Sequence, residues 1–279
     1  TGRIIRNPSK TVENWSTESP PPEISPQEPA LPVFSPRDSA LVEINSVCGY
    51  ETDLSGWLQK PLSWDLTVPE PTVLILHTHG TESYTKTEDY TESSAYRTLN
   101  TDYNVVSIGE KLAVELEQNG IRVIHDRTLH DYPSYNGSYT HARQAIAGYL
   151  AEYPSIRLVL DLHRDASGDP SNQLRTQATV NGQPSAQLML VMGTDAGGLY
   201  HPNWQENLAV GVKLQALLER QYPGFCRPLQ LRTERFNQDL SAAGMILEVG
   251  AAGDSLEEAL AAAGALARAI VTLSRGTGG

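Results

Sequence analysis

The stretch Val73-Leu-Ile-Leu-His-Thr-His-Gly-Thr-Glu-Ser-Tyr84 decides how the rest of this chain is interpreted. Its first four residues form a short apolar run, which is typical of a strand buried on both faces of a parallel sheet. Two histidines and a glutamate follow at once. They are therefore predicted to lie where the strand ends and a loop begins.

Two later apolar runs have the same form. Ile156-Arg-Leu-Val-Leu-Asp-Leu-His163 ends in a histidine, and Gly244-Met-Ile-Leu-Glu-Val-Gly250 carries one carboxylate, Glu248. In open α/β sheets, ligands bind in the crevice outside the carboxyl ends of the strands. We therefore predict that His79, His163 and Glu248 meet at one edge of a sheet.

Apolar strands and amphipathic helices alternate along most of the chain. Helices are predicted at 103–119, 138–152, 203–221 and 254–274. The dipeptide Asn181-Gly182 predicts a hairpin between strands at 175–180 and 186–192, and weak alternation predicts an edge strand at 40–47. Strand–helix alternation with short connections predicts an α/β fold, in which a mainly parallel, twisted sheet has helices on both faces.

The first 36 residues do not follow this pattern. They contain Pro20-Pro-Pro22 and further Ser-Pro pairs, with almost no apolar periodicity. Such a segment buries too little surface to offset its ordering entropy, so 1–36 is predicted to be an extended, flexible spacer. Residues 37–279 are predicted to form one α/β catalytic domain, and 48–70 within it are predicted to be irregular.

Composition narrows the possible partners and the redox chemistry. The formal net charge of −12 argues against a nucleic-acid partner, which requires a basic face. No apolar run approaches the roughly 20 residues that cross a bilayer. Two cysteines, Cys48 and Cys226, are too few for a disulfide framework. They are either two separate thiols or one long-range disulfide.

The histidines and the loop glutamate have the chemistry of a zinc site. His79 and Glu82 are three residues apart, so one turn can direct both side chains at one point. With the remote His163 they make a set of two imidazoles and one carboxylate, which is typical of catalytic zinc because one coordination position stays open. Structural histidines are the alternative. Three other acidic residues compete with the loop glutamate as ligand: Glu88, Glu92 and Asp102.

Other polar residues are predicted to support this site. His77 is assigned a supporting or substrate-contacting role, with direct ligation as the alternative, and Asp161 is placed to accept an imidazole N–H. Arg232, Asn237 and Gln238 lie just before the third apolar run. Arginine suits a substrate carboxylate, so these three are candidates for peptide binding. A solvated loop is the alternative.

Glu248 interrupts an apolar strand, and its burial is the reason to assign it a catalytic role. A buried carboxylate without a partner is costly, so we expect it to face a cavity or a water molecule. Burial also raises its pKa, which suits a group that takes a proton from water and returns it to a leaving amine. An ion pair with an arginine is the alternative.

Other mechanisms have less support. No G-x-S-x-G sequence indicates a serine nucleophile, and no glycine-rich loop indicates phosphate binding. A glycosidase with Glu82 and Glu248 as its carboxylate pair leaves the histidines without a role. The residues therefore favour a metal-dependent amide hydrolase.

Five stretches acquire meaning in combination. They are His77-Thr-His-Gly-Thr-Glu-Ser-Tyr84, Val159-Leu-Asp-Leu-His-Arg-Asp-Ala166, Trp204-Gln-Glu-Asn-Leu208, Leu231-Arg-Thr-Glu-Arg-Phe-Asn-Gln238 and Leu247-Glu-Val-Gly250. In this order they resemble the stage II sporulation protein P family, cell-wall hydrolases of endospore-forming bacteria. The resemblance runs from about residue 40 to the last predicted helix.

The resemblance implies a zinc-dependent N-acetylmuramoyl-L-alanine amidase with a fold like that of zinc amidases and carboxypeptidases. Peptide cross-link cleavage is implied as a second activity. His79, Glu82 and His163 would hold Zn²⁺, and Glu248 would be the catalytic acid/base. A zinc carboxypeptidase or endopeptidase is the alternative activity, and an inactive peptidoglycan-binding scaffold is the alternative of another class.

The resemblance also implies a location and partners. The protein would act on the glycan and stem peptide of peptidoglycan, outside the cytoplasmic membrane, during engulfment of the forespore. A membrane anchor is expected upstream of this chain, which begins with threonine. A lytic transglycosylase resembling stage II sporulation protein D is the expected partner.

Overall fold

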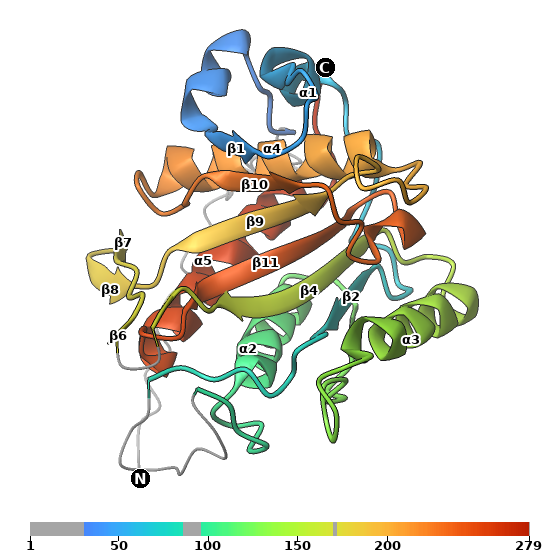
Figure 1. Cartoon of the computed structure of the whole chain (residues 1–279). Coiled ribbons are helices and arrows are strands. Elements are labelled where there is room, and N and C mark those ends of the chain that lie inside the picture. Colours follow the sequence, from blue (N-terminus) through green and yellow to red (C-terminus); the bar gives the residue numbers. More distant parts are fainter. Residues whose placement is uncertain (1–30, 86–95, 170–171, 279) are drawn as a thin grey trace, which may run out of the picture. The chain divides into compact units, whose positions relative to one another are not determined.

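A seven-stranded sheet lies at the centre of the computed structural model, which describes residues 31–85, 96–169 and 172–278 (Figure 1). In spatial order the strands are β1 (Ile44–Ser46), β10 (Leu229–Arg232), β9 (Leu188–Gly193), β11 (Gly244–Ala251), β4 (Leu158–Asp165), β2 (Val73–Leu76) and β3 (Val123–His125). All neighbours are parallel except β9 and β11. The predicted α/β fold with a mainly parallel sheet is confirmed.

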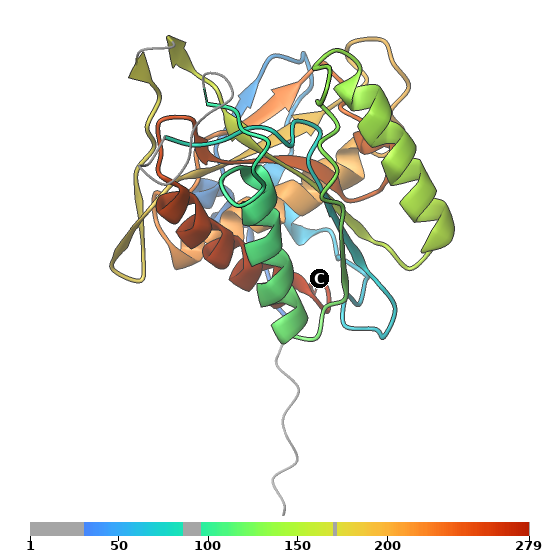
Figure 2. The ribbon, with the colours of Figure 1, turned by 90° about the horizontal axis from the view of Figure 1, so that it is seen from below.

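Helices cover both faces of this sheet. The helical segments are η1 (Pro36–Leu41), α1 (Leu54–Gln59), α2 (Val105–Gln118), α3 (Ser138–Glu152), α4 (Trp204–Gln221), η2 (Gln238–Leu240) and α5 (Leu256–Leu273). Helices α2, α4 and α5 pack on one face, which we call the back face and whose core includes Val73 and Ile75 of β2. Helix α3 packs on the front face, against Leu74 and Leu76 (Figure 2). The alternation along β2 follows from the two-residue period of a strand.

Strand parity also decides where the polar residues point. Along β4, Leu160 and Leu162 belong to the back-face core, so Asp161 and His163 face the front. In β11, Glu248 is the register partner of His163. Side chains of register partners lie on the same face, so Glu248 also faces the front.

The hairpin prediction was half correct. Asn181, with a left-handed φ of 52°, and Gly182 do form a turn, but it joins β7 (Ala178–Val180) to β8 (Gln183–Ser185). The predicted second strand, 186–192, is instead the sheet strand β9. All six residues of β9 are buried, as expected for a strand covered on both faces. A further two-stranded ribbon consists of β5 (Gly168–Asp169) and β6 (Asn172–Gln173).

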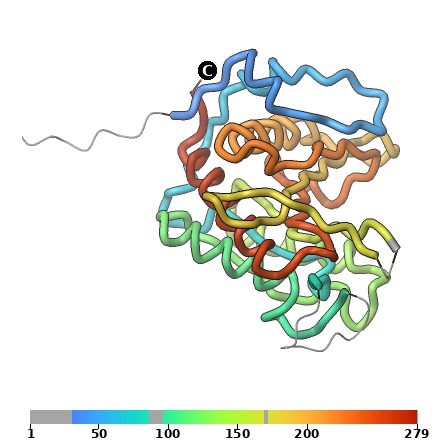
Figure 3. Tube along the Cα trace, turned by 90° about the vertical axis from the view of Figure 1, so that its left-hand side faces the viewer, coloured from blue at the N-terminus to red at the C-terminus, as the bar shows by residue number. Residues whose placement is uncertain are grey.

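The ends of the described chain lie side by side. The Gly278 N–H donates to the Pro32 carbonyl (3.2 Å), and Thr277 bridges to Leu62 (Figure 3). Phe34 belongs to the main core. Most of the predicted spacer lies outside the described residues, so its boundary at 36 stays a prediction.

Three other sequence expectations can be compared with the structure. Cys48 and Cys226 are both free thiols. Within the segment predicted to be irregular, 54–59 form helix α1. No helix in the described part of the chain combines the length and the apolar composition that crossing a membrane requires.

Candidate active site

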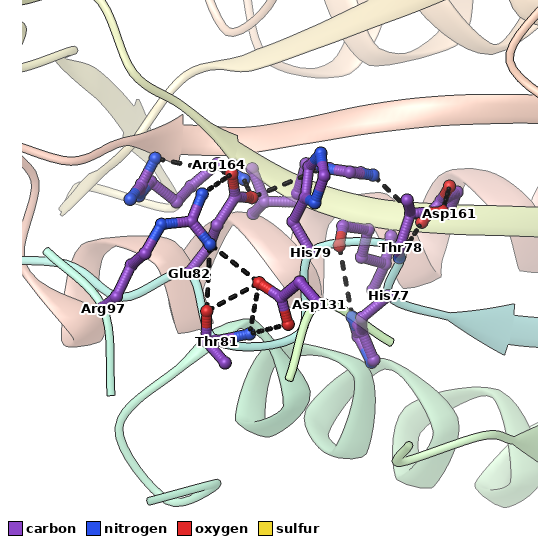
Figure 4. Close-up of polar contacts among 12 residues, drawn as sticks. His77, Thr78, His79, Thr81, Glu82, Arg97, Asp131, Asp161 and Arg164 are labelled. Atoms are coloured by element: carbon purple, nitrogen blue, oxygen red, sulfur yellow. Dashed lines mark hydrogen bonds and ion pairs between the residues drawn. The ribbon is translucent and has the colours of Figure 1, made fainter. Parts of the chain in front are cut away.

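The turn after β2 separates two histidines, His77 and His79, that have only Thr78 between them. His77 continues the parity of Val73 and Ile75 and points to the back face, whereas the chain turns after Thr78 and brings His79 to the front (Figure 4). Asp161 holds this turn, because its carboxylate accepts hydrogen bonds from the Thr78 N–H (2.7 Å) and hydroxyl (2.6 Å).

His163 lies between two carboxylates. Its Nδ1 is 3.3 Å from Glu82 Oε2, and its Nε2 is 3.0 Å from Asp161 Oδ1. All three side chains are buried. Burial lowers the pKa of His163, but the charges of Asp161 and Glu82 outweigh it and raise that pKa well above its usual value. In the metal-free protein an imidazolium therefore occupies a position of negative potential.

His79 is held from its outer side by aromatic rings. Its ring stacks on Tyr135 (centroids 4.4 Å apart), and the Tyr135 hydroxyl is 3.1 Å from His79 Nε2. The other nitrogen, Nδ1, is buried and has no hydrogen-bond partner among the residues that the structure describes. The rings of His79 and His163 meet edge to face at 5.2 Å. His79 thus presents an unused nitrogen close to the His163 ring.

Two arginines fix the Glu82 carboxylate. Arg164 donates its backbone N–H to Glu82 Oε2 (3.3 Å), and its Nη1 is 3.6 Å from Oε1. Arg97 Nη2 is 3.5 Å from Oε1, and Arg97 also donates to Asp131 (2.7 Å) and Thr81 (2.9 Å) (Figure 4). Burial raises the pKa of Glu82, but Arg164 and His163 outweigh it, so this carboxyl stays ionised.

Glu248 differs from Glu82 in that its pKa is raised and not lowered. Its Oε2 atom is buried, and within the described part of the chain it has no hydrogen-bond partner. Burial, with the nearby negative charge of Glu82, raises the pKa of Glu248 to about 8, although His163 opposes the shift. The pKa of Glu82 is thus lowered and that of Glu248 is raised within one site. Carboxyl groups whose pKa values are shifted in opposite directions often have different roles in catalysis.

The residues present have the donor chemistry of a zinc site, but they do not form a finished one. The separation of 3.3 Å between His163 Nδ1 and Glu82 Oε2 is about what two ligands of one tetrahedral zinc have, given bonds of about 2.0–2.1 Å. The His79 ring, whose Nδ1 has no hydrogen-bond partner among the described residues, lies 5.2 Å from the His163 ring. Across 31–85, 96–169 and 172–278, however, no group of three or more His, Cys, Asp or Glu side chains is arranged to hold a metal. The proposed ligands are close in pairs only.

The remaining predicted site residues lie elsewhere. His77 is fully buried against His125 (Nε2 to Nε2, 2.9 Å) and the Leu162 carbonyl. Gln238 binds the Gly193 N–H and the Val191 carbonyl of β9 through its amide. Their supporting or substrate-binding roles stay predictions.

Arg232 and Asn237, which were predicted together with Gln238, are nearer the surface. Arg232 ends β10 and is partly buried. Asn237 donates to the Tyr139 carbonyl (2.8 Å), and the Tyr139 ring lies 5.5 Å from that of His79. Of the three rivals of Glu82, Glu88 and Glu92 lie outside the described residues, and Asp102 is exposed.

Backbone strain concentrates around this site. Four non-glycine residues within the described ranges have positive φ: Tyr96, Asn181, Phe236 and Asn237. Each such residue costs roughly 1–2 kcal/mol when it lacks a local compensation. Asn181 lies in the β7–β8 turn, where this conformation is required. The other three adjoin the site, where strained backbone is most often found.

Asp161→Asn is expected to weaken zinc binding by roughly 10–100-fold, the usual effect of losing a carboxylate that orients a histidine ligand. The amide would also place donors against the Thr78 N–H. The measurement is a competition titration with a chromogenic chelator. Asp126→Asn is the matched control, because Asp126 also accepts from a backbone N–H and lies 3.1 Å from a histidine, away from this site. Equal affinity in both variants would contradict the prediction.

Comparison with known proteins gives one family and several similar folds. Residues 9–271 match the family described as stage II sporulation protein P (SpoIIP). The curated stage II sporulation protein P of Bacillus subtilis (strain 168) is 29% identical over 268 residues, which are 91% of this chain and 61% of that protein. The chain therefore spans less than two thirds of its curated relative.

Solved structures with a similar fold include three N-acetylmuramoyl-L-alanine amidases. The protein from Clostridium difficile 630 is 14% identical, with a TM-score of 0.44, over 74% of this chain and 97% of its own. The one from Nostoc punctiforme is 14% identical, with a TM-score of 0.39, over 72% and 95%. The one from Mycobacterium smegmatis is 12% identical, with a TM-score of 0.41, over 74% and 96%.

Proposed function

This chain belongs to the stage II sporulation protein P family, and from that premise we propose that it is a zinc-dependent N-acetylmuramoyl-L-alanine amidase. Its substrate would be the amide between N-acetylmuramic acid and the L-alanine of the stem peptide. The observation that carries the proposal is the meeting of His79, His163, Glu82 and Glu248 on one face of the sheet. An inactive scaffold would not need a carboxyl group with a raised pKa, such as Glu248, beside three residues that could bind a metal.

The four residues divide the chemistry between them. His79, His163 and Glu82 would hold the metal, and Asp161 would keep the His163 ring in place. Bound zinc supplies a water of lowered pKa and polarises the scissile carbonyl. A cation at this site would favour the ionised form of Glu248, which takes one proton from the attacking water as the water oxygen bonds to the carbonyl carbon. The same carboxyl then donates that proton to the nitrogen of L-alanine, so the C–N bond breaks and a neutral amine leaves.

Location and partners rest on the family alone. We propose that the protein acts on the outer side of the cytoplasmic membrane in peptidoglycan remodelling during spore engulfment. It would be anchored by a segment not present in this chain. The proposed partner is a lytic transglycosylase resembling stage II sporulation protein D.

The products of wall digestion test the proposal. Purified sacculi are digested with zinc-loaded protein, and the soluble products are labelled at free amines and identified by mass spectrometry. An amidase is expected to release stem peptides with a new amino-terminal L-alanine and glycan free of peptide. Cut cross-links with an intact lactyl amide would indicate an endopeptidase instead. Binding to sacculi with no product would support the scaffold alternative and contradict the proposal.

A further inference from the structure

A groove of about 470 Å³ opens on the front face beside the candidate active site. Its volume is in the range of sites that enclose small ligands. Its lining residues are Tyr139, Gly197, Leu199, Thr233, Glu234, Arg235, Phe236 and Asn237. Most of them come from the 233–237 loop between β10 and η2, whose sequence the proposed chemistry does not use.

Tyr139 connects the groove to the proposed catalytic residues. Its ring lies 5.5 Å from that of His79 on one side and 6.0 Å from that of Phe236 on the other. Both aromatic rings pack over Met189, Val191 and Ile246 of the sheet. A substrate whose scissile bond lies at His79 would therefore extend over Tyr139 to Phe236.

The loop that carries Phe236 is held in an unfavourable conformation. Phe236 and Asn237 have consecutive positive φ values of 50° and 62°. A left-handed backbone is uncommon for a bulky aromatic residue and persists only when surrounding contacts impose it. Strained residues of this kind cluster at ligand-binding sites.

Neighbouring elements supply those contacts. Gln238 is hydrogen-bonded to β9, and the Asn237 amide donates to the Tyr139 carbonyl. The loop backbone also passes so close to Gly193 that a Cβ there would lie 2.4 Å from the Glu234 carbonyl oxygen. The fold thus keeps the Phe236 ring in the groove at a cost in backbone free energy.

The lining indicates the chemistry of the ligand. The groove is lined by one acidic residue, Glu234, and one basic residue, Arg235, so its lining carries no net formal charge in a chain of net charge −12. The Arg235 guanidinium is also paired with Asp239 (3.2 Å). Asn237 Oδ1 accepts no hydrogen bond from any residue that the structure describes, so it can accept a peptide N–H. The two half-buried rings are tilted by 42° to each other and offer apolar surface to the side chains of a peptide.

We propose that this groove binds the peptide part of the substrate, with Phe236 as the residue that determines its affinity. The inference rests on the proposed function for its substrate class. It assigns the stem peptide to the Tyr139–Phe236 groove and leaves the glycan outside it.

Equilibrium binding tests the groove without requiring turnover. Two probes, a soluble disaccharide–tetrapeptide and the same disaccharide without peptide, are titrated calorimetrically into zinc-loaded Glu248→Gln protein. Adding Phe236→Gly is expected to weaken muropeptide binding at least tenfold and to change disaccharide binding less than twofold. Glycine adopts the left-handed conformation freely, so this change removes the ring without opposing the turn. Phe236→Tyr, which keeps the ring, is expected to stay within threefold of the parent.

Asn181→Gly is the matched control, because it also places glycine at a left-handed residue, φ 52°, in the β7–β8 turn. Its muropeptide affinity is expected to be unchanged. Unchanged affinity in the Phe236→Gly protein, or an equal loss for both probes, would overturn the inference. The outcome is separable from the proposed function: peptide binding through Phe236 without any hydrolysis would reject the amidase alone. Hydrolysis with affinity independent of Phe236 would reject the groove alone.

Discussion

Glu248→Gln is expected to lower the rate of wall hydrolysis by about 10²–10⁴-fold, the usual contribution of a general acid/base. Glutamine keeps the size of the side chain but cannot carry the proton from water to the leaving amine. Release of free amino-terminal L-alanine from sacculi measures the rate. Glu115→Gln is a matched control, because Glu115 forms a surface pair with Lys111 on α2. Hydrolysis by the Glu248 variant within about threefold of wild type would reject the catalytic assignment.

The same substitution has a second, independent readout in stability. Burial raises the pKa of Glu248 from 4.5 to about 8. Between these values the folded protein holds a proton that the unfolded chain has released, so wild-type stability falls as pH rises through this window. Metal-free Glu248→Gln protein should therefore melt at the same temperature as wild type near pH 4. It should melt progressively higher than wild type towards pH 8. A constant difference across this range would contradict the raised pKa.

Local sequence signals were sufficient where the structure depends on local interactions. The Ser255 and Glu258 side chains form a capping box at the start of α5, a pattern that the four residues 255–258 display by themselves. The sequence did not reveal that β9 lies between β10 and β11, antiparallel to β11. An apolar strand is compatible with any central position, and its place depends on contacts between distant segments.

For the candidate site too, the sequence predicts some residues and misses others. His79, His163 and Glu248 were found because strand ends in an α/β sheet are places of known function. Arg97 and Tyr135 were not found, because each comes from a loop without periodicity and reaches the site only through tertiary contacts. Tyr135 stacks on His79 and lies 5.0 Å from the Arg97 guanidinium carbon. No pattern within either loop indicates those partners.

Removing either proposed imidazole ligand is expected to abolish stoichiometric zinc binding. The loss of affinity should exceed the roughly 10–100-fold that loss of a supporting group causes. His79→Ala and His163→Gln are the two variants. Glutamine is chosen at 163 because alanine would remove the donor that lies between the buried carboxylates of Glu82 and Asp161. Zinc content after dialysis measures the result, and a thermal melt confirms that each variant is folded.

His141→Ala is the matched control, since His141 is exposed on α3 and, among the described residues, its ring is hydrogen-bonded only to the His130 backbone carbonyl. It should retain about one zinc per chain.

Zinc affinity should also fall as pH falls, because ligands must lose their protons to bind the metal and the paired carboxylates raise the pKa of His163. If both variants are folded and keep the zinc content of the wild type, His79 and His163 are not zinc ligands. The edge-to-face contact between them would then be the complete explanation of their meeting.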